Sequence, residues 1–140
     1  MHTGLLRTVG ALTFAYGVTT ACRPELLARP CGLVGPDGDV APHTAAVLRP
    51  LAWRDAASGL AMVVAPEGPA LATAAAVRIA SDVGDAVLFG SALPGRLRRA
   101  GAVVTALGWA GLTVAGLVGR PEPARRHRLA CRCAAGRTPQ

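Results

Sequence analysis

One stretch of this sequence constrains the fold more than any other. Residues 100–119, AGAVVTALGWAGLTVAGLVG, contain no charged side chain, and about 20 apolar residues in a helix span the hydrocarbon core of a bilayer. Three further apolar segments precede this one, and they predict helices over residues 4–21, 52–65 and 69–91. The last two are separated by Pro66-Glu67-Gly68-Pro69, a turn signal. The sequence therefore predicts an all-α, four-transmembrane-helix bundle, a multi-pass protein of the cell membrane with the lipid bilayer as its first partner.

Composition supports this prediction. Apolar residues make up 51% of the chain but aromatic residues only 4%, so a soluble core would lack its usual bulky side chains. Gly is abundant instead, and Gly10 with Gly17, like Gly101 with Gly108, lies at a spacing of seven residues. Such seams of small residues let a neighbouring helix approach closely, whether from this chain, a second copy or another membrane protein. The net charge is +7, but the arginines that carry it are not interleaved with aromatic residues. This arrangement argues against a nucleic-acid partner.

The segments outside these helices differ in character. Residues 23–51 are rich in Pro and Gly, which predicts a long first loop with short helical turns only near residues 25–29 and 44–49. Residues 120–140 carry six arginines and predict a basic, disordered tail that follows a membrane domain of residues 1–119. In the first apolar segment, Arg7 fits a membrane span if its side chain reaches toward a headgroup. The same segment has features of a secretory signal peptide, but three later apolar segments favour the span.

Charged residues interrupt the apolar hairpin formed by residues 52–90. On its second helix, Arg78, Asp82 and Asp85 share one face, because they stand at i, i+4 and i+7. Counting outward from the turn at 1.5 Å per residue places Asp55 level with Arg78, and Arg54 level with Asp82. We therefore expect two ion pairs across the hairpin, with Asp85 left without a cation.

Charges within lipid are costly, at least about 2.5–3.5 kcal/mol each, so they face a protein interior or a wet cavity. Two interpretations follow: the cluster either only holds the hairpin together, or it forms a site. For a site, Asp85 is the expected proton donor or acceptor, because an apolar surrounding disfavours an unpaired carboxylate. The expected catalytic residues are Asp85, Asp82 and Asp55, and the expected substrate-binding residues are Arg54, Arg78 and Ser58.

Other kinds of site have little support in the sequence. It contains no GxSxG, P-loop, HExxH or paired CxxC motif, so no cofactor is expected. Asp82 and Asp85 could share a divalent cation, but Arg78 would compete with it. His127 with Cys131 and Cys133 offers only three metal ligands, and no metal site is expected. The sequence allows a disulfide between Cys22 and Cys31 if the first loop is extracytoplasmic, but it does not require one.

One resemblance adds to this picture. Arg54-Asp55 followed by Gly59 in one helix, and Arg78, Asp82 and Asp85 in the next, resembles small four-helix bacterial membrane proteins of the loose DoxX-like neighbourhood, many of actinobacterial type. The resemblance covers residues 4–119 except the long first loop, and it leaves the tail unmatched. It implies a four-helix bundle with its polar residues pointing inward, and it assigns no reaction to any of them.

Two classes of function remain. The first is binding of a lipophilic small molecule from the bilayer, with cofactor-free acid–base chemistry such as isomerisation, cyclisation or epoxide opening. In that case the arginines would stabilise an oxyanion. The alternative is a non-catalytic membrane subunit, a chaperone or a small carrier. A site requires a cavity beside Asp82 and Asp85, whereas a purely structural bundle closes over its paired charges.

Overall fold

A computed structural model describes residues 1–119, and these residues form five helices and no strand. The helices are α1 (Thr3–Cys22), α2 (Glu25–Cys31), α3 (Pro42–Val64), α4 (Pro69–Ala92) and α5 (Arg96–Val118). The all-α class predicted from the sequence is confirmed. The basic tail predicted over residues 120–140 lies outside the described residues.

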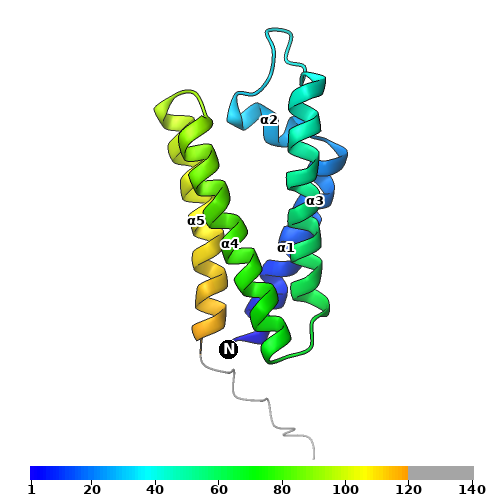
Figure 1. Cartoon of the computed structure of the whole chain (residues 1–140), viewed down its shortest axis with the longest axis vertical. Coiled ribbons are helices and arrows are strands. Elements are labelled where there is room, and N and C mark those ends of the chain that lie inside the picture. Colours follow the sequence, from blue (N-terminus) through cyan, green and yellow to red (C-terminus); the bar gives the residue numbers. More distant parts are fainter. Residues whose placement is uncertain (120–140) are drawn as a thin grey trace, which may run out of the picture.

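The four long helices form two closely packed pairs, α1 with α3 and α4 with α5. In Figure 1 the pairs lie close together at the end that holds the N-terminus and the α3–α4 turn, and they diverge toward the other end. Contacts of α3 with α4 and of α1 with α5 join the two pairs. The short helix α2 lies between the diverging ends and contacts α1, α3 and α5.

Glycines explain why α1 and α3 pack so closely. A Cβ atom added to Gly17 would lie 2.5 Å from the backbone nitrogen of Ala56, and one added to Gly59 would lie 2.5 Å from the backbone nitrogen of Phe14. Both distances are too short for any side chain, so the two backbones are in direct contact. The seam predicted at Gly10 and Gly17 therefore receives a neighbour, and that neighbour is α3.

The second predicted seam has no such neighbour in residues 1–119. A Cβ atom added to Gly101 or to Gly108 would meet nothing within 4 Å. Gly101 instead borders the cavity described below. The spacing of seven residues is thus matched by a helix contact within the chain at Gly10 and Gly17, and a neighbour for Gly101 and Gly108 stays a prediction.

The predicted long first loop is wrong over much of its length. Helix α3 begins at Pro42, ten residues before the predicted start, so the turn predicted near residues 44–49 is part of a long helix. The helical turn predicted near residues 25–29 is confirmed as α2. Pro42 stands in the first turn of α3, where a missing N–H costs nothing. Pro50 lies inside α3 without ending it, although an interior proline costs about 3 kcal/mol. Burial of Leu48 and Ala52 on either side of Pro50 offsets that cost.

Arg7 has hydrogen-bond partners within the protein. Its guanidinium group donates hydrogen bonds to the backbone carbonyl oxygens of Val63 and Ala65, the latter at 3.2 Å. The last carbonyl groups of a helix have no partner within the helix, and a cation there is favourable. Arg7 therefore ties α1 to the C-terminal end of α3.

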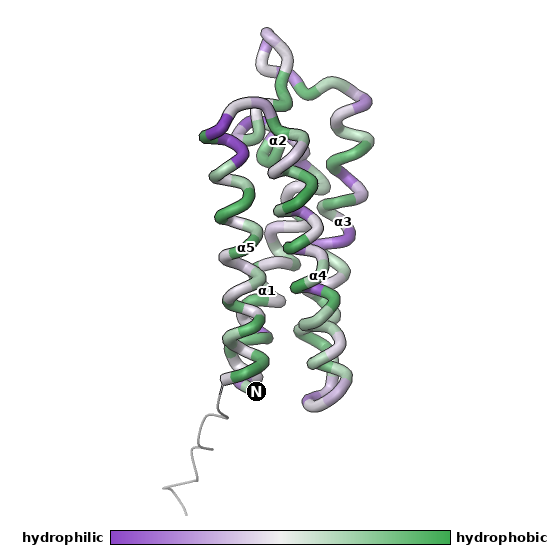
Figure 2. Tube along the Cα trace, turned by 60° about the vertical axis from the view of Figure 1, so that its left-hand side comes forward, coloured by the Kyte–Doolittle hydropathy of each residue, from purple (hydrophilic) through white to green (hydrophobic). Residues whose placement is uncertain are grey.

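Hydropathy distinguishes α5 from the other helices. Within residues 1–119, α5 alone is long and apolar enough to cross a membrane by length and composition. Helices α3 and α4 each carry three charged residues, which interrupt otherwise apolar surfaces; these are Arg49, Arg54, Asp55, Arg78, Asp82 and Asp85. Figure 2 shows largely apolar long helices and a hydrophilic α4–α5 turn. The four-span arrangement stays a prediction.

Candidate functional site

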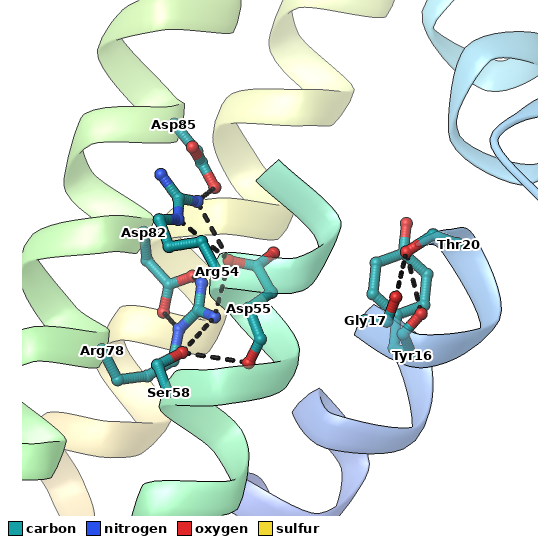
Figure 3. A network of polar contacts seen from close by, with 9 residues as sticks. All are labelled: Tyr16, Gly17, Thr20, Arg54, Asp55, Ser58, Arg78, Asp82 and Asp85. Carbon is teal, nitrogen blue, oxygen red and sulfur yellow. Dashed lines mark hydrogen bonds and ion pairs between the residues drawn. The ribbon is translucent and has the colours of Figure 1, made fainter. Parts of the chain in front are cut away.

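The charged residues of α3 and α4 form one connected cluster (Figure 3). Arg78 is at its centre: its Nη1 atom lies 3.0 Å from Asp55 Oδ1, and its Nε atom donates to Asp82 Oδ2 at 3.0 Å. A second contact joins Arg78 Nη2 to Asp82 Oδ1, so this pair is bidentate. The side chains of Arg78 and Asp82 are each only 4% exposed. Arg78 is thus a buried cation held by two carboxylates.

Ser58 closes the buried end of the cluster. Its hydroxyl group accepts a hydrogen bond from Arg78 Nη1 at 3.3 Å and donates one to the backbone oxygen of Asp55 at 3.0 Å. Ser58 lies one turn after Asp55 on α3, which brings both side chains to the same face. Ser58 therefore positions Arg78 in this structure, and it does not line the cavity.

Arg54 holds the opposite end of the cluster. Its Nη2 atom lies 2.9 Å from Asp55 Oδ1 and 2.6 Å from Asp85 Oδ2. The Arg54 side chain is 37% exposed, whereas that of Asp85 is 13% exposed. Arg54 therefore connects the cluster to the protein surface.

The predicted pairing is half right. The pair between Asp55 and Arg78 is confirmed. The pair between Arg54 and Asp82 is wrong, because Asp82 binds Arg78 one turn earlier on its own helix. Arg54 then reaches the next acidic residue on that face, Asp85. The prediction that Asp85 has no cation is wrong for the same reason.

Asp85 is nevertheless only half satisfied. Its Oδ2 atom binds Arg54, but its Oδ1 atom is buried and accepts no hydrogen bond from any residue that the structure describes. Two guanidinium groups face three carboxyl groups in the cluster, so one carboxyl group has no counter-charge of its own. A buried acceptor without a partner carries a desolvation penalty of about 1–3 kcal/mol. Asp85 is the position where a donor would be most stabilising.

The cluster borders a cavity of about 860 Å³ that all five helices line. This volume lies in the range of small-molecule sites, which are mostly apolar with a few polar groups. Its charged lining consists of Asp55, Arg78, Asp82 and Asp85 near the middle of the bundle and of Arg98 at the start of α5. Most of the remaining lining is apolar, for example Leu12, Leu51, Phe89, Ala106 and Trp109.

Sequence reasoning missed the contributions of α1, α2 and α5 to this cavity. Helix α1 supplies Leu12, Thr13, Tyr16 and Thr20, and Figure 3 shows Tyr16 and Thr20 across from the charged cluster. Thr13, Tyr16 and Thr20 stand at i, i+3 and i+7 on one helix face, and this polar stripe is a signal that could have been read from the sequence. No sequence pattern indicates that Cys31 and Arg98 line the cavity, because their positions depend on how α2 packs against α5.

Arg98 and α2 meet at the diverging end of the bundle. Helix α2 ends at Cys31 and is capped by Gly32, whose φ of 69° is left-handed and favours glycine. The Arg98 guanidinium group lies where a side chain at this position would have to go. Gly32 therefore allows α2 to close against the start of α5, which completes the cavity wall.

Cys31 is a buried thiol in that wall. Both Cys22 and Cys31 are free, so the disulfide considered from the sequence does not form in this structure. Burial raises the pKa of the Cys31 thiol above its ordinary value, because an apolar surrounding disfavours the thiolate. Cys31 is thus kept in its protonated form at neutral pH.

Among residues 1–119, no three His, Cys, Asp or Glu side chains are grouped so as to hold a metal ion. The set of His127, Cys131 and Cys133 lies outside the described residues. Comparison with models of protein families, with curated proteins and with solved structures finds no match to this chain. Any function must therefore be argued from the geometry of the cluster and its cavity.

Proposed function

We propose that this protein is an integral membrane protein that binds a lipophilic small molecule in the cavity between its two helix pairs. The observation that carries the proposal is the apolar cavity of about 860 Å³ with Asp55, Asp82, Asp85 and Arg78 in its wall. A bundle whose charges served only to join its helices would close over them. This cavity favours a small-molecule site over the alternative of a purely structural subunit.

The outer surface supports a membrane setting. Large apolar side chains outside the cavity are exposed on all four long helices, including Phe14, Val64, Val87 and Val104, which are 37–70% exposed. Exposed apolar side chains on every long helix suit contact with lipid tails. The ion pairs offset the cost of placing charges within such a bundle. A lipophilic ligand would reach the cavity from the same lipid phase.

Tryptophan quenching tests the proposal in detergent micelles. The chain has two tryptophans: Trp109 lines the cavity, whereas Trp53 is 55% exposed. A Trp53→Phe variant therefore reports on the cavity, and a Trp109→Phe variant reports on the micelle. With 1-bromododecane as the quencher, we expect saturable quenching of Trp109 and only linear, partition-like quenching of Trp53.

A matched pair of substitutions on α5 controls this experiment. Ala106→Phe places a ring in the cavity, whereas Ala115→Phe places the same ring on an exposed face outside it. We expect Ala106→Phe alone to abolish the saturable component. If Trp109 and Trp53 are quenched alike, or if both phenylalanine variants behave like the parent, the cavity does not bind apolar molecules and the proposal fails.

The free Oδ1 atom of Asp85 favours a catalytic version of this function. A carboxyl group with one unpaired oxygen beside an apolar cavity can give a proton to, or take one from, a bound substrate. Asp82 and Asp55, both held by Arg78, then keep the site in position. The corresponding test compares wild-type and Asp85→Asn protein incubated with a lipid extract. A compound consumed only by the wild type supports catalysis, and an identical profile contradicts it.

A further inference from the structure

We propose that the molecule bound in this cavity carries a protonated amine, which pairs with Asp85. This inference rests on the proposed function and adds the chemical class of the ligand. It follows from the juxtaposition of an apolar cavity with a carboxyl group whose Oδ1 atom has no hydrogen-bond partner in residues 1–119, in a cluster that has three carboxyl groups and two guanidinium groups.

The cluster has one carboxyl group more than it has guanidinium groups. Arg54 and Arg78 supply two positive charges, and Asp55, Asp82 and Asp85 supply three negative ones. Arg78 is occupied on all sides, by Asp55, Asp82 and Ser58. The Nη2 atom of Arg54 contacts both Asp55 and Asp85, so these two carboxyl groups share one guanidinium nitrogen. The uncompensated negative charge therefore lies at the Asp85 end, where it borders the cavity.

The carboxyl group of Asp85 also has an unused hydrogen-bond acceptor. Its Oδ1 atom is a buried acceptor, and no group in residues 1–119 donates to it. An ammonium group offers both a positive charge and N–H donors, so it satisfies the charge and the hydrogen bond together. An alcohol satisfies only the second, and a carboxylate would add repulsion.

The other titratable and charged groups around the cavity do not change this argument. Tyr16, across from the cluster on α1, is neutral when protonated. Asp85 stands seven residues before the end of α4 and Arg98 two residues after the start of α5, which places Arg98 about 7.5 Å nearer the α4–α5 turn at 1.5 Å per residue. Because Arg98 is exposed, water and salt weaken the effect of its charge on Asp85. The body of the ligand would lie between them, against Leu12, Phe89 and Trp109.

Competition against 1-bromododecane, read from Trp109 in the Trp53→Phe protein, tests the inference. The competitors are 1-dodecylamine, 1-dodecanol and dodecanoate, which share one chain and differ in head group. At neutral pH we expect the amine to displace the quencher at about tenfold lower concentration than the alcohol, and dodecanoate to be the weakest. In an Asp85→Asn variant, the amine and the alcohol should compete equally.

Asp37→Asn is the matched control, because Asp37 is exposed in the segment between α2 and α3 and its loss changes the net charge equally. It should leave the preference for the amine intact. If amine and alcohol compete equally in the parent protein while quenching saturates, Asp85 is neutralised by a proton and the inference is wrong, although the proposed function stands. If quenching never saturates, both fail. A preference that survives Asp85→Asn likewise refutes the role of Asp85.

Discussion

The contact between α1 and α3 makes the sharpest prediction, because it depends on backbone atoms alone. In Gly59→Ala, the new Cβ atom would lie 2.5 Å from the backbone nitrogen of Phe14 and 2.6 Å from the backbone oxygen of Gly10. To reach an ordinary contact of 3.4 Å, the two helices would have to separate by about 0.9 Å, the difference between 3.4 and 2.5 Å. Neither obstacle is a flexible side chain that could move aside.

The expected change in the free energy of unfolding of Gly59→Ala combines two opposing effects. Overpacking of a tight contact costs about 1–3 kcal/mol, and two backbone obstacles place Gly59 at the upper end of that range. Replacing glycine by alanine inside a helix returns about 1 kcal/mol. The net loss of stability is therefore about 2 kcal/mol, which lowers Tm by roughly 6 °C in a chain of this size.

Gly108→Ala is the matched control. Gly108 lies in the middle of α5, and a Cβ atom there would meet nothing within 4 Å. It should keep the helix-propensity gain and raise Tm slightly. Thermal unfolding of both variants in one detergent, followed by tryptophan fluorescence and circular dichroism, measures the difference. Equal Tm values for the two variants would refute the close backbone contact.

The remaining predictions concern the cluster and the cavity wall. Arg78→Met leaves Asp82 buried without its partner, so we expect a loss of about 3–5 kcal/mol in the same unfolding assay. Adding Asp82→Asn should recover at least about 1 kcal/mol, and strictly additive losses would contradict the pairing. In a background with Cys131 and Cys133 replaced by serine, iodoacetamide should label exposed Cys22 first and buried Cys31 more slowly. Because burial raises the Cys31 pKa, its thiolate and its labelling rate should rise only at higher pH, and equal rates for both thiols would contradict this burial.

Several features could be read from local sequence. The helices predicted over residues 4–21 and 69–91 agree within one residue with α1 and α4, because apolar composition and the turn at Pro66 determine them locally. The shared face of Arg78, Asp82 and Asp85 follows from helical periodicity, and all three line the cavity. Prolines misled the prediction between residues 23 and 51. Pro42 begins a helix and Pro50 is tolerated within one, which depends on packing that sequence does not display.

By itself, then, the sequence determined the helical class and the five charged residues that meet inside the bundle, since both follow from periodicity along one or two helices. Only the tertiary structure decided which charges pair. Asp82 pairs with Arg78 on its own helix, so Arg54 pairs with Asp85 instead. The tertiary structure also decided that the charges border a cavity, because α1, α2 and α5 form most of its wall and approach from distant parts of the chain. Long-range packing of this kind leaves no local pattern, and the free oxygen of Asp85 is its consequence.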